Sequence, residues 1–244
     1  MSKRNKAKKP QWKPEPTDIN ILILGSAGVG KSREIAVVGH GLESCTKDLQ
    51  PIPFSKPDDP TCRIVLVDTP GFLDTYEEDI FQTERWLRML LENDARIAGV
   101  IYLHDISQGR SMATDCVWET TQDICGQDAF QNMVIVTTKW ELSPGLAECR
   151  CEEELSDIVW KRAREKGARV VRFDGTQVSA RQIISLATQE PLIKPLQLER
   201  DLRRRRGGNL GHSFDKPLRS PPSDSGSTLN QTTTTRCGEW TAKL

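Results

Sequence analysis

The sequence predicts an α/β fold in three layers, with a mostly parallel central sheet between helices. Two observations predict it. Short, continuous apolar runs alternate along the chain with longer amphipathic runs, and a glycine-rich loop directly follows the first apolar run. Continuous rather than alternating apolarity is typical of strands that helices cover on both faces. Alternation of such strands with helices indicates right-handed crossover connections.

The expected elements follow one another in a regular order. Apolar runs predict five strands, at residues 19–24, 64–67, 99–103, 133–137 and 170–173. A further strand is expected at residues 50–54, forming a hairpin with residues 64–67 across the turn Asp58-Asp59-Pro60. Amphipathic periodicity predicts helices at residues 81–91, 112–125, 148–166 and 180–189.

The two ends of the chain differ from its middle in composition. Residues 1–17 combine Lys, Pro and polar residues with almost nothing to bury, so we expect a disordered basic arm. Residues 201–244 start with a basic run at 203–206 and continue as a Ser- and Thr-rich stretch, which predicts a second disordered tail. The folded domain is therefore expected within residues 18–200.

The basic run at 203–206 allows several interpretations. It could contact acidic lipid, nucleic acid or a nuclear import receptor, or it could be the solvated end of the last helix. Because no aromatic residues interleave with this run, the sequence predicts no nucleic-acid binding.

Overall composition favours no particular class of partner, because 34 Lys and Arg residues balance 34 Asp and Glu residues. No stretch approaches the roughly 18 consecutive apolar residues of a membrane helix, so no transmembrane segment is expected. The first residues lack the apolar centre of a signal peptide, which favours a cytoplasmic location, with a nuclear one as the alternative. The seven cysteines are then interpreted as free thiols.

The loop after the first predicted strand matches the pattern G-x-x-x-x-G-K-[ST] in full, at Gly25, Ser26, Ala27, Gly28, Val29, Gly30, Lys31 and Ser32. Glycines allow the backbone to turn so that successive N–H groups surround a phosphate. Lys31 would neutralise β- and γ-phosphate oxygens, and Ser32 would place its hydroxyl on Mg²⁺. An ordinary glycine-rich turn is the alternative, and the strand immediately before the loop argues against it.

A second motif supports the first. The strand at residues 64–67 runs into Asp68-Thr69-Pro70-Gly71. An Asp at the carboxyl end of a neighbouring parallel strand lies where a second-shell ligand of Mg²⁺ is needed. Gly71 could offer its N–H to the γ-phosphate, so that loss of this phosphate releases the segment that follows.

Together the two motifs resemble those of the translation-factor-related GTPases, and among them the septin-like and immunity-associated branch. Residues 38–46 and 99–106 are similar to sequence segments of a group of fungal G-domain proteins. The resemblance as a whole covers residues 19–189. It implies a P-loop NTPase fold of the G-domain type that binds GTP or GDP with Mg²⁺. It also implies Thr46 as the switch threonine, which reaches Mg²⁺ and the γ-phosphate and assists Lys31 in catalysis.

The resemblance also implies a site that selects guanine. The Asn-Lys-x-Asp motif of these proteins corresponds to Thr138, Lys139 and Glu141, with Thr in place of Asn and Glu in place of Asp. The carboxylate of this motif accepts from the N1–H and the amino group of guanine. Ser179 and Ala180 correspond to the last motif, which supports the base.

This chain departs from the family after the phosphate loop, where only residues 33–38 separate Ser32 from the Gly39-His40 phrase. This is under two helical turns, which predicts a shortened first helix. The segment is either a genuine deletion or a product of gene prediction.

Three functions remain open from these residues. The first is a GTP-binding switch that hydrolyses GTP slowly and is stimulated by homodimerisation or by a regulatory protein. The second is a pseudo-GTPase that serves as a non-catalytic interaction module, which Thr138, Glu141 and the shortened helix favour. The third is an ATPase, which the lack of a clear pair of carboxylates after a strand disfavours. His104 ends a strand near the expected site, where a structural role is favoured over a catalytic one.

Overall fold

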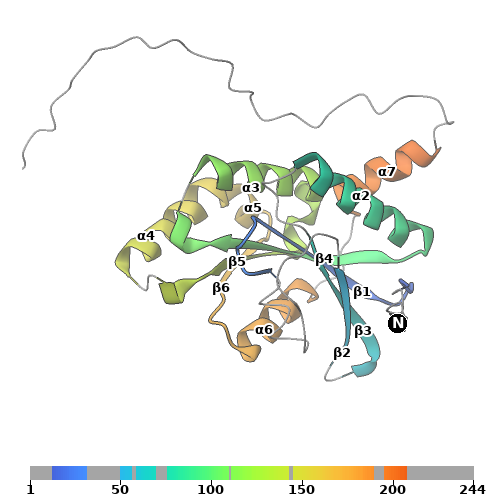
Figure 1. Ribbon diagram of the computed structural model, residues 1–244, viewed down its shortest axis with the longest axis horizontal. Helices are drawn as coiled ribbons and strands as arrows, with labels where there is room; N and C mark the ends of the chain where they lie inside the picture. The colour runs from blue at the N-terminus through green and yellow to red at the C-terminus, as the bar shows by residue number, and fades with distance from the viewer. Residues whose placement is uncertain are drawn as a thin grey trace, which may run out of the picture. The chain divides into compact units, whose positions relative to one another are not determined.

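The centre of the protein is a sheet in which six described strands lie in the order β2-β3-β1-β4-β5-β6 (Figure 1). The strands are β1 (Ile19–Gly25), β2 (Gln50–Lys56), β3 (Asp59–Asp68), β4 (Arg96–Asp105), β5 (Met133–Thr138) and β6 (Arg169–Arg172). The computed structural model describes residues 13–31, 50–56, 59–69, 76–109, 111–142, 145–189 and 195–207. Only β2 runs antiparallel, as the partner of β3. The mostly parallel sheet and its hairpin are therefore confirmed, but Asp59 and Pro60, which were expected in the turn, belong to β3.

Helices cover both faces of this sheet, which confirms the three-layer α/β architecture. They are α2 (Tyr76–Glu92), α3 (Met112–Cys125), α4 (Leu146–Glu154), α5 (Lys161–Glu165), α6 (Gln177–Ala187) and α7 (Gln197–Gly207). Figure 1 shows α2, α3, α5 and α7 on one face and α6 on the other. The shortened first helix expected after Lys31 lies outside the described residues.

Alternate side chains of the central strand enter two separate cores. Leu22 and Leu24 of β1 pack with aromatic side chains from the α2, α3 and α5 side, including Trp86, Trp118 and Trp160. Ile21 and Ile23 pack on the opposite face with α6. Because β1 is buried on both faces, its apolar run is continuous rather than alternating.

Two of the helices differ from their sequence-based expectation. The helix expected at residues 148–166 is interrupted by a π-helical turn at Leu155–Val159, where the N–H of Trp160 donates to the carbonyl of Leu155 at 2.8 Å. Helix α7 runs across the boundary expected at residue 200, and its Leu202 is buried against the core. Residues 1–12 and 208–244 lie outside the described parts of the chain, so the two disordered tails stay predictions.

None of the described helices is long and apolar enough to cross a bilayer.

Gly99 in β4 provides a test of how closely α6 packs on the sheet. A Cβ atom at this position would overlap the backbone carbonyl oxygen of Ala187, the last residue of α6. Because backbone cannot move aside as a side chain does, we expect Gly99→Ala to lower the free energy of unfolding by about 3 kcal/mol. Urea denaturation measures this change.

The matched control is Gly145→Ala, where the atom closest to the added Cβ is the flexible carboxylate end of Glu148 and no backbone atom is closer than 4.0 Å. An unchanged midpoint for Gly99→Ala would contradict the close approach of α6 to β4.

Candidate functional site

The carboxyl ends of the parallel strands meet along one edge of the sheet. Strands β1 and β4 are in register at Gly25 and Leu103, and β4 and β5 at Asp105 and Thr138. Asp68 ends β3 beside Ile23 of β1. In open α/β sheets ligands bind at this edge. The parallel register therefore collects most of the predicted site residues that the structure describes, although they come from distant parts of the sequence.

The phosphate loop leaves β1 in a conformation that requires glycine. Gly25, Gly28 and Gly30 have φ angles of +151°, +71° and +107°, which other residues rarely adopt. At Gly25 a Cβ would also lie 2.7 Å from the carbonyl oxygen of Leu103. At Gly28 and Gly30 a Cβ would meet nothing within 4 Å, so the space beside the backbone there is open. An open, glycine-rich backbone turn of this kind can accommodate a phosphate group.

Lys31 turns back across the loop that precedes it. Its side chain is largely buried, at 7% exposure, and its ammonium donates to the carbonyls of Gly25 at 3.1 Å and Ser26 at 2.9 Å. The cation is thus held within the loop by the loop's own backbone. A positive charge inside an open, glycine-lined turn is the combination that a polyphosphate requires. The described part of this site therefore fits a nucleoside polyphosphate.

Asp68 and Thr69 lie next to this loop. Asp68 is fully buried at the end of β3, and the Thr69 hydroxyl donates to the carbonyl of Ile23 in β1 at 2.7 Å. This bond fixes the end of β3 against the strand that carries the phosphate loop. A carboxylate here suits a metal held beside phosphates. Three other predicted residues, Ser32, Thr46 and Gly71, lie outside the described residues.

Thr138, where the related motif has Asn, faces the interior. It is 3% exposed, and its hydroxyl donates to the carbonyl of Val29 at 2.9 Å and lies 3.3 Å from that of His104. Val29 belongs to the phosphate loop, and His104 belongs to β4. Thr138 therefore tethers the end of β5 to the phosphate loop.

Lys139 follows in a left-handed conformation, with φ +61°. Its ammonium binds the carboxylate of Asp105 at 2.6 Å, and the same carboxylate accepts from the backbone and hydroxyl of Ser107. Burial alone would raise the pKa of Asp105, but its hydrogen bonds to Lys139 and Ser107 hold that pKa below its ordinary value. Asp105 was not among the predicted site residues, although its place at the end of an apolar strand was a usable signal.

The remaining predicted base contacts, Glu141, Ser179 and Ala180, follow the two neighbouring strands β5 and β6. Glu141 is exposed in the single 3₁₀ turn η3 (Trp140–Leu142) that follows Lys139. Ser179 and Ala180 are buried in the first turn of α6, where Ala180 packs into the core beneath the sheet. The segment that connects β6 to α6 at the carboxyl edge is residues 173–176. Residues 174–176 of this segment are exposed, whereas Phe173 is buried in the core.

His104 belongs to the core rather than to the open edge. Its side chain is 3% exposed, and its ring lies edge-on to Trp160 with 5.3 Å between the centroids. Desolvation lowers its pKa to about 4, although nearby Asp105 and Asp115 oppose that shift. The imidazole is therefore neutral at physiological pH and has a structural role.

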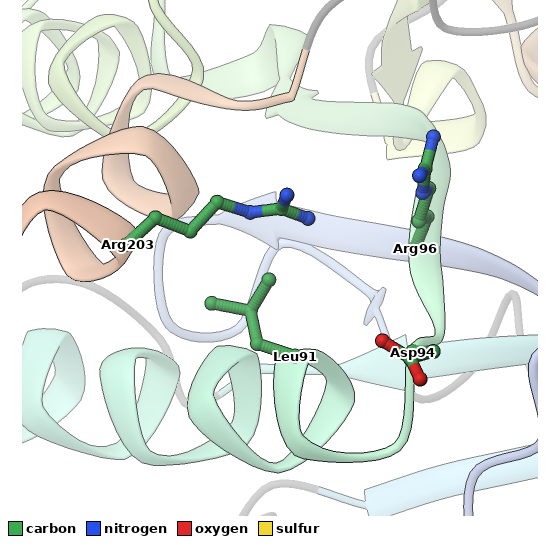
Figure 2. Close-up of a pocket in the computed structure, with 4 residues that line it drawn as sticks. All are labelled: Leu91, Asp94, Arg96 and Arg203. Carbon is green, nitrogen blue, oxygen red and sulfur yellow. The ribbon is translucent and has the colours of Figure 1, made fainter. Parts of the chain in front are cut away.

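A cavity of about 320 Å³ lies at the opposite side of the sheet from the carboxyl ends of the strands. Leu91, Asp94, Arg96 and Arg203 line it (Figure 2). Arg96 begins β4, so one strand length of roughly 30 Å separates the cavity from the carboxyl edge. Leu91 belongs to the last turn of α2, which has no basic residue of its own. The two arginines complement the negative end of that helix, which gives them a structural role.

Comparisons with known proteins agree with the fold. No protein-family model matches the chain. Over 67 residues, 25% of the chain, it is 39% identical to GTP-binding protein A of Dictyostelium discoideum, and the match spans 14% of that protein. Toc33 from Arabidopsis thaliana, in complex with GDP and Mg²⁺, is similar in structure, with a TM-score of 0.56 and 17% identity over 75% of this chain and 88% of that one.

A further solved structure concerns the chloroplast translocon components atToc33 and psToc159, for which dimerization is important for GTPase activity. Its TM-score is 0.54, with 14% identity over 71% of this chain and 82% of that one. At such identities the likeness establishes the fold alone, which is a three-layer α/β fold like that of Toc33.

The buried imidazole of His104 leads to a prediction about stability and pH. The unfolded state binds this proton with a pKa near 6.5 and the folded state with one of about 4, so the unfolded state binds more protons between these values. The contribution of His104 to stability is therefore present above pH 6.5 and is lost as the pH falls towards 4. Between pH 7 and pH 5 we expect a loss of about 2 kcal/mol from this group.

Urea denaturation of the wild type and of His104→Phe at both pH values measures this contribution, which should vanish in the variant. Equal losses in the two proteins, or an imidazole that titrates near pH 6.5 by NMR, would refute the assignment.

Proposed function

We propose that this chain binds guanine nucleotide, GTP or GDP together with Mg²⁺, at the carboxyl edge of its sheet. One observation carries the proposal: the Lys31 ammonium is held inside a glycine loop whose positive φ angles leave open space beside Gly28 and Gly30. A structure of the same fold contains GDP and Mg²⁺, and this supports the choice of ligand.

Each proposed site residue has a role that follows from its chemistry. Lys31 and the backbone from Gly25 to Gly30 neutralise and orient phosphate oxygens. Asp68 is proposed as a second-shell partner of the metal, with Ser32 and Thr46 as direct ligands by resemblance to the family. Mg²⁺, when bound, neutralises charge that develops on the phosphates. Gly71 is proposed to sense the γ-phosphate through its N–H.

Base selection is assigned to the end of β5. Glu141 is the proposed acceptor for the N1–H and amino group of guanine, with Lys139 along the base. The Thr138 hydroxyl is engaged with the phosphate loop, so it supports the base site rather than contacting the base. Residues 173–176, with Ser179 and Ala180 behind them, are proposed to support the base through the backbone.

We further propose slow hydrolysis of GTP and a switch role, stimulated by a second copy of this chain or by a regulatory protein. Support for stimulation by dimerisation comes from the similar structure in which dimerization is important for GTPase activity.

The septin-like and immunity-associated branch, with its fungal members, is the proposed family. Its support comes from residues 38–46 and 99–106, of which the second group lies on β4 and the turn after it.

A non-catalytic pseudo-GTPase is the second candidate. Besides Thr138, Glu141 and the shortened helix, one more feature favours it: the residues after Gly71 are Phe72-Leu73-Asp74, with no Gln to orient an attacking water. Both candidates bind nucleotide, so they differ in turnover alone.

Binding is tested on Lys31. Fluorescence titration with GTP, GDP and ATP in the presence of Mg²⁺ should show tighter binding of the two guanine nucleotides. Lys31→Ala removes the buried cation, so GTP affinity should fall by at least about thirtyfold. The control is Lys161→Ala, an exposed lysine at the start of α5. Equal binding of all three nucleotides, unaffected by Lys31→Ala, would eliminate the proposed site.

Turnover is tested by phosphate release from GTP. The wild type should hydrolyse GTP on the order of 10⁻³ per second, as P-loop GTPases do without an activating partner. If dimerisation stimulates the reaction, the rate per chain rises with protein concentration. Protein that binds GTP yet releases no phosphate above the Lys31→Ala background is the non-catalytic module instead.

A further inference from the structure

Four side chains next to the base motif form a closed ring of contacts. The indole N–H of Trp140 donates to the Thr137 hydroxyl at 3.1 Å, and that hydroxyl donates to Glu152 Oε1 at 2.7 Å. Glu152 Oε2 accepts from Arg172 Nε at 2.8 Å and from its Nη2 at 2.6 Å. The guanidinium carbon of Arg172 lies 4.0 Å from the centroid of the Trp140 indole, and this contact closes the ring of four side chains. We call these four residues the Trp140 ring.

The Trp140 ring is fixed by the fold on several sides. Thr137 and Arg172 are register partners on the neighbouring strands β5 and β6, and Glu152 reaches them from α4. Thr137 is fully buried, and the side chain of Glu152 is only 13% exposed. Hydrogen bonding to Glu152 raises the pKa of Arg172, in keeping with a stable ion pair. Trp140 is therefore held by both its edge and its face.

Trp140 stands between the two residues that are proposed to contact the base. Before it, the Lys139 ammonium is anchored on Asp105 at 2.6 Å. After it, the N–H of Leu142 donates to the carbonyl of Lys139 at 3.1 Å and closes the η3 turn. The backbone that carries Glu141 is thus restrained through Lys139, Trp140 and the turn itself.

This restraint matters because Glu141 is longer than the Asp of the related motif. One additional rotatable bond gives the carboxylate more positions, and each polar contact then costs more conformational entropy to form. When the backbone that carries Glu141 is fixed, the carboxylate at the end of the side chain can reach fewer positions. Selectivity with Glu at this position therefore depends on how firmly η3 is held.

We propose that Trp140 is a positioning residue: the Trp140 ring holds η3 so that Glu141 can read the N1–H and 2-amino group of guanine. The inference rests on the proposed guanine binding and adds a specific source for base selectivity. Trp140 itself need not touch the nucleotide, because it acts through the backbone of Glu141.

The test compares three ligands in the presence of Mg²⁺: GTP, inosine triphosphate and inorganic tripolyphosphate. Inosine lacks the 2-amino group, so the ratio of the two nucleotide affinities isolates the carboxylate contact. Tripolyphosphate reports the phosphate loop alone. In Trp140→Leu and Thr137→Val we expect the preference for GTP over inosine triphosphate to fall about fivefold. Tripolyphosphate affinity should stay within about twofold of the wild type, because the phosphate loop is unchanged.

Conservative and neighbouring variants separate positioning from general damage. Thr137→Ser keeps the hydroxyl and should keep the preference. Leu142→Ala changes an exposed side chain, 64% accessible, in the same turn and should also keep it. Thermal unfolding of each variant checks that it is folded.

The outcomes distinguish this inference from the function on which it rests. If the wild type binds GTP and inosine triphosphate equally, guanine reading by Glu141 is wrong and the inference falls with it. If the wild type prefers GTP but Trp140→Leu keeps the full preference, only the inference is overturned. A parallel loss of tripolyphosphate affinity would also overturn it, since the Trp140 ring would then merely stabilise the fold.

Discussion

The parallel pairing of β1 with both β3 and β4 is the constraint on which the site depends. This pairing brings Gly25, Asp68 and Asp105 to the same edge of the sheet, although they are spread over 80 positions of the chain. The pairing is itself maintained by burial on both faces, because Leu22 and Ile23 enter opposite cores. Burial of the apolar strands thus brings their carboxyl ends together. Polar residues lie close to one another there because they are located at the strand ends.

A second level of organisation links the elements of this edge by polar contacts. Thr138 joins the end of β5 to Val29 of the phosphate loop, and Thr69 joins the end of β3 to β1. Both hydroxyls are buried and donate to backbone carbonyls, so each satisfies a group that would otherwise be costly to bury. Thr138 therefore supplies a hydrogen-bond donor to the phosphate loop from the position where the motif that it resembles has Asn.

Much of the fold could be predicted from the sequence because local patterns encode it. The apolar runs of β1 and β5 are continuous, and the helix expected at residues 112–125 coincides with α3, which a capping box at Ser111 and Thr114 starts. The π-helical turn before Trp160 could not be predicted, because the sequence does not show which carbonyl the N–H of Trp160 selects. Helix α7 is rich in charge but crosses the expected domain boundary because it contacts the core, mainly through Leu198 and Leu202; the end of a helix was one interpretation of its basic run at 203–206. Its helicity depends on tertiary packing rather than on its own pattern.

The candidate site shows the same division between local and long-range information. The phosphate loop is contiguous, and its glycines are required by φ angles that belong to the loop itself, so eight letters of sequence suffice to find it. The Trp140 ring joins residues from 137 to 172, and only the pairing of β5 with β6 brings its ends together. Contacts of this kind have no signature in a single sequence. They nevertheless bear on chemistry, because a site with a longer carboxylate at position 141 gains its precision from the backbone beneath it. In the proposed site, where Thr138 and Glu141 differ from the Asn and Asp of the motif that they resemble, base selection therefore depends more on surrounding tertiary contacts than on these two residues alone.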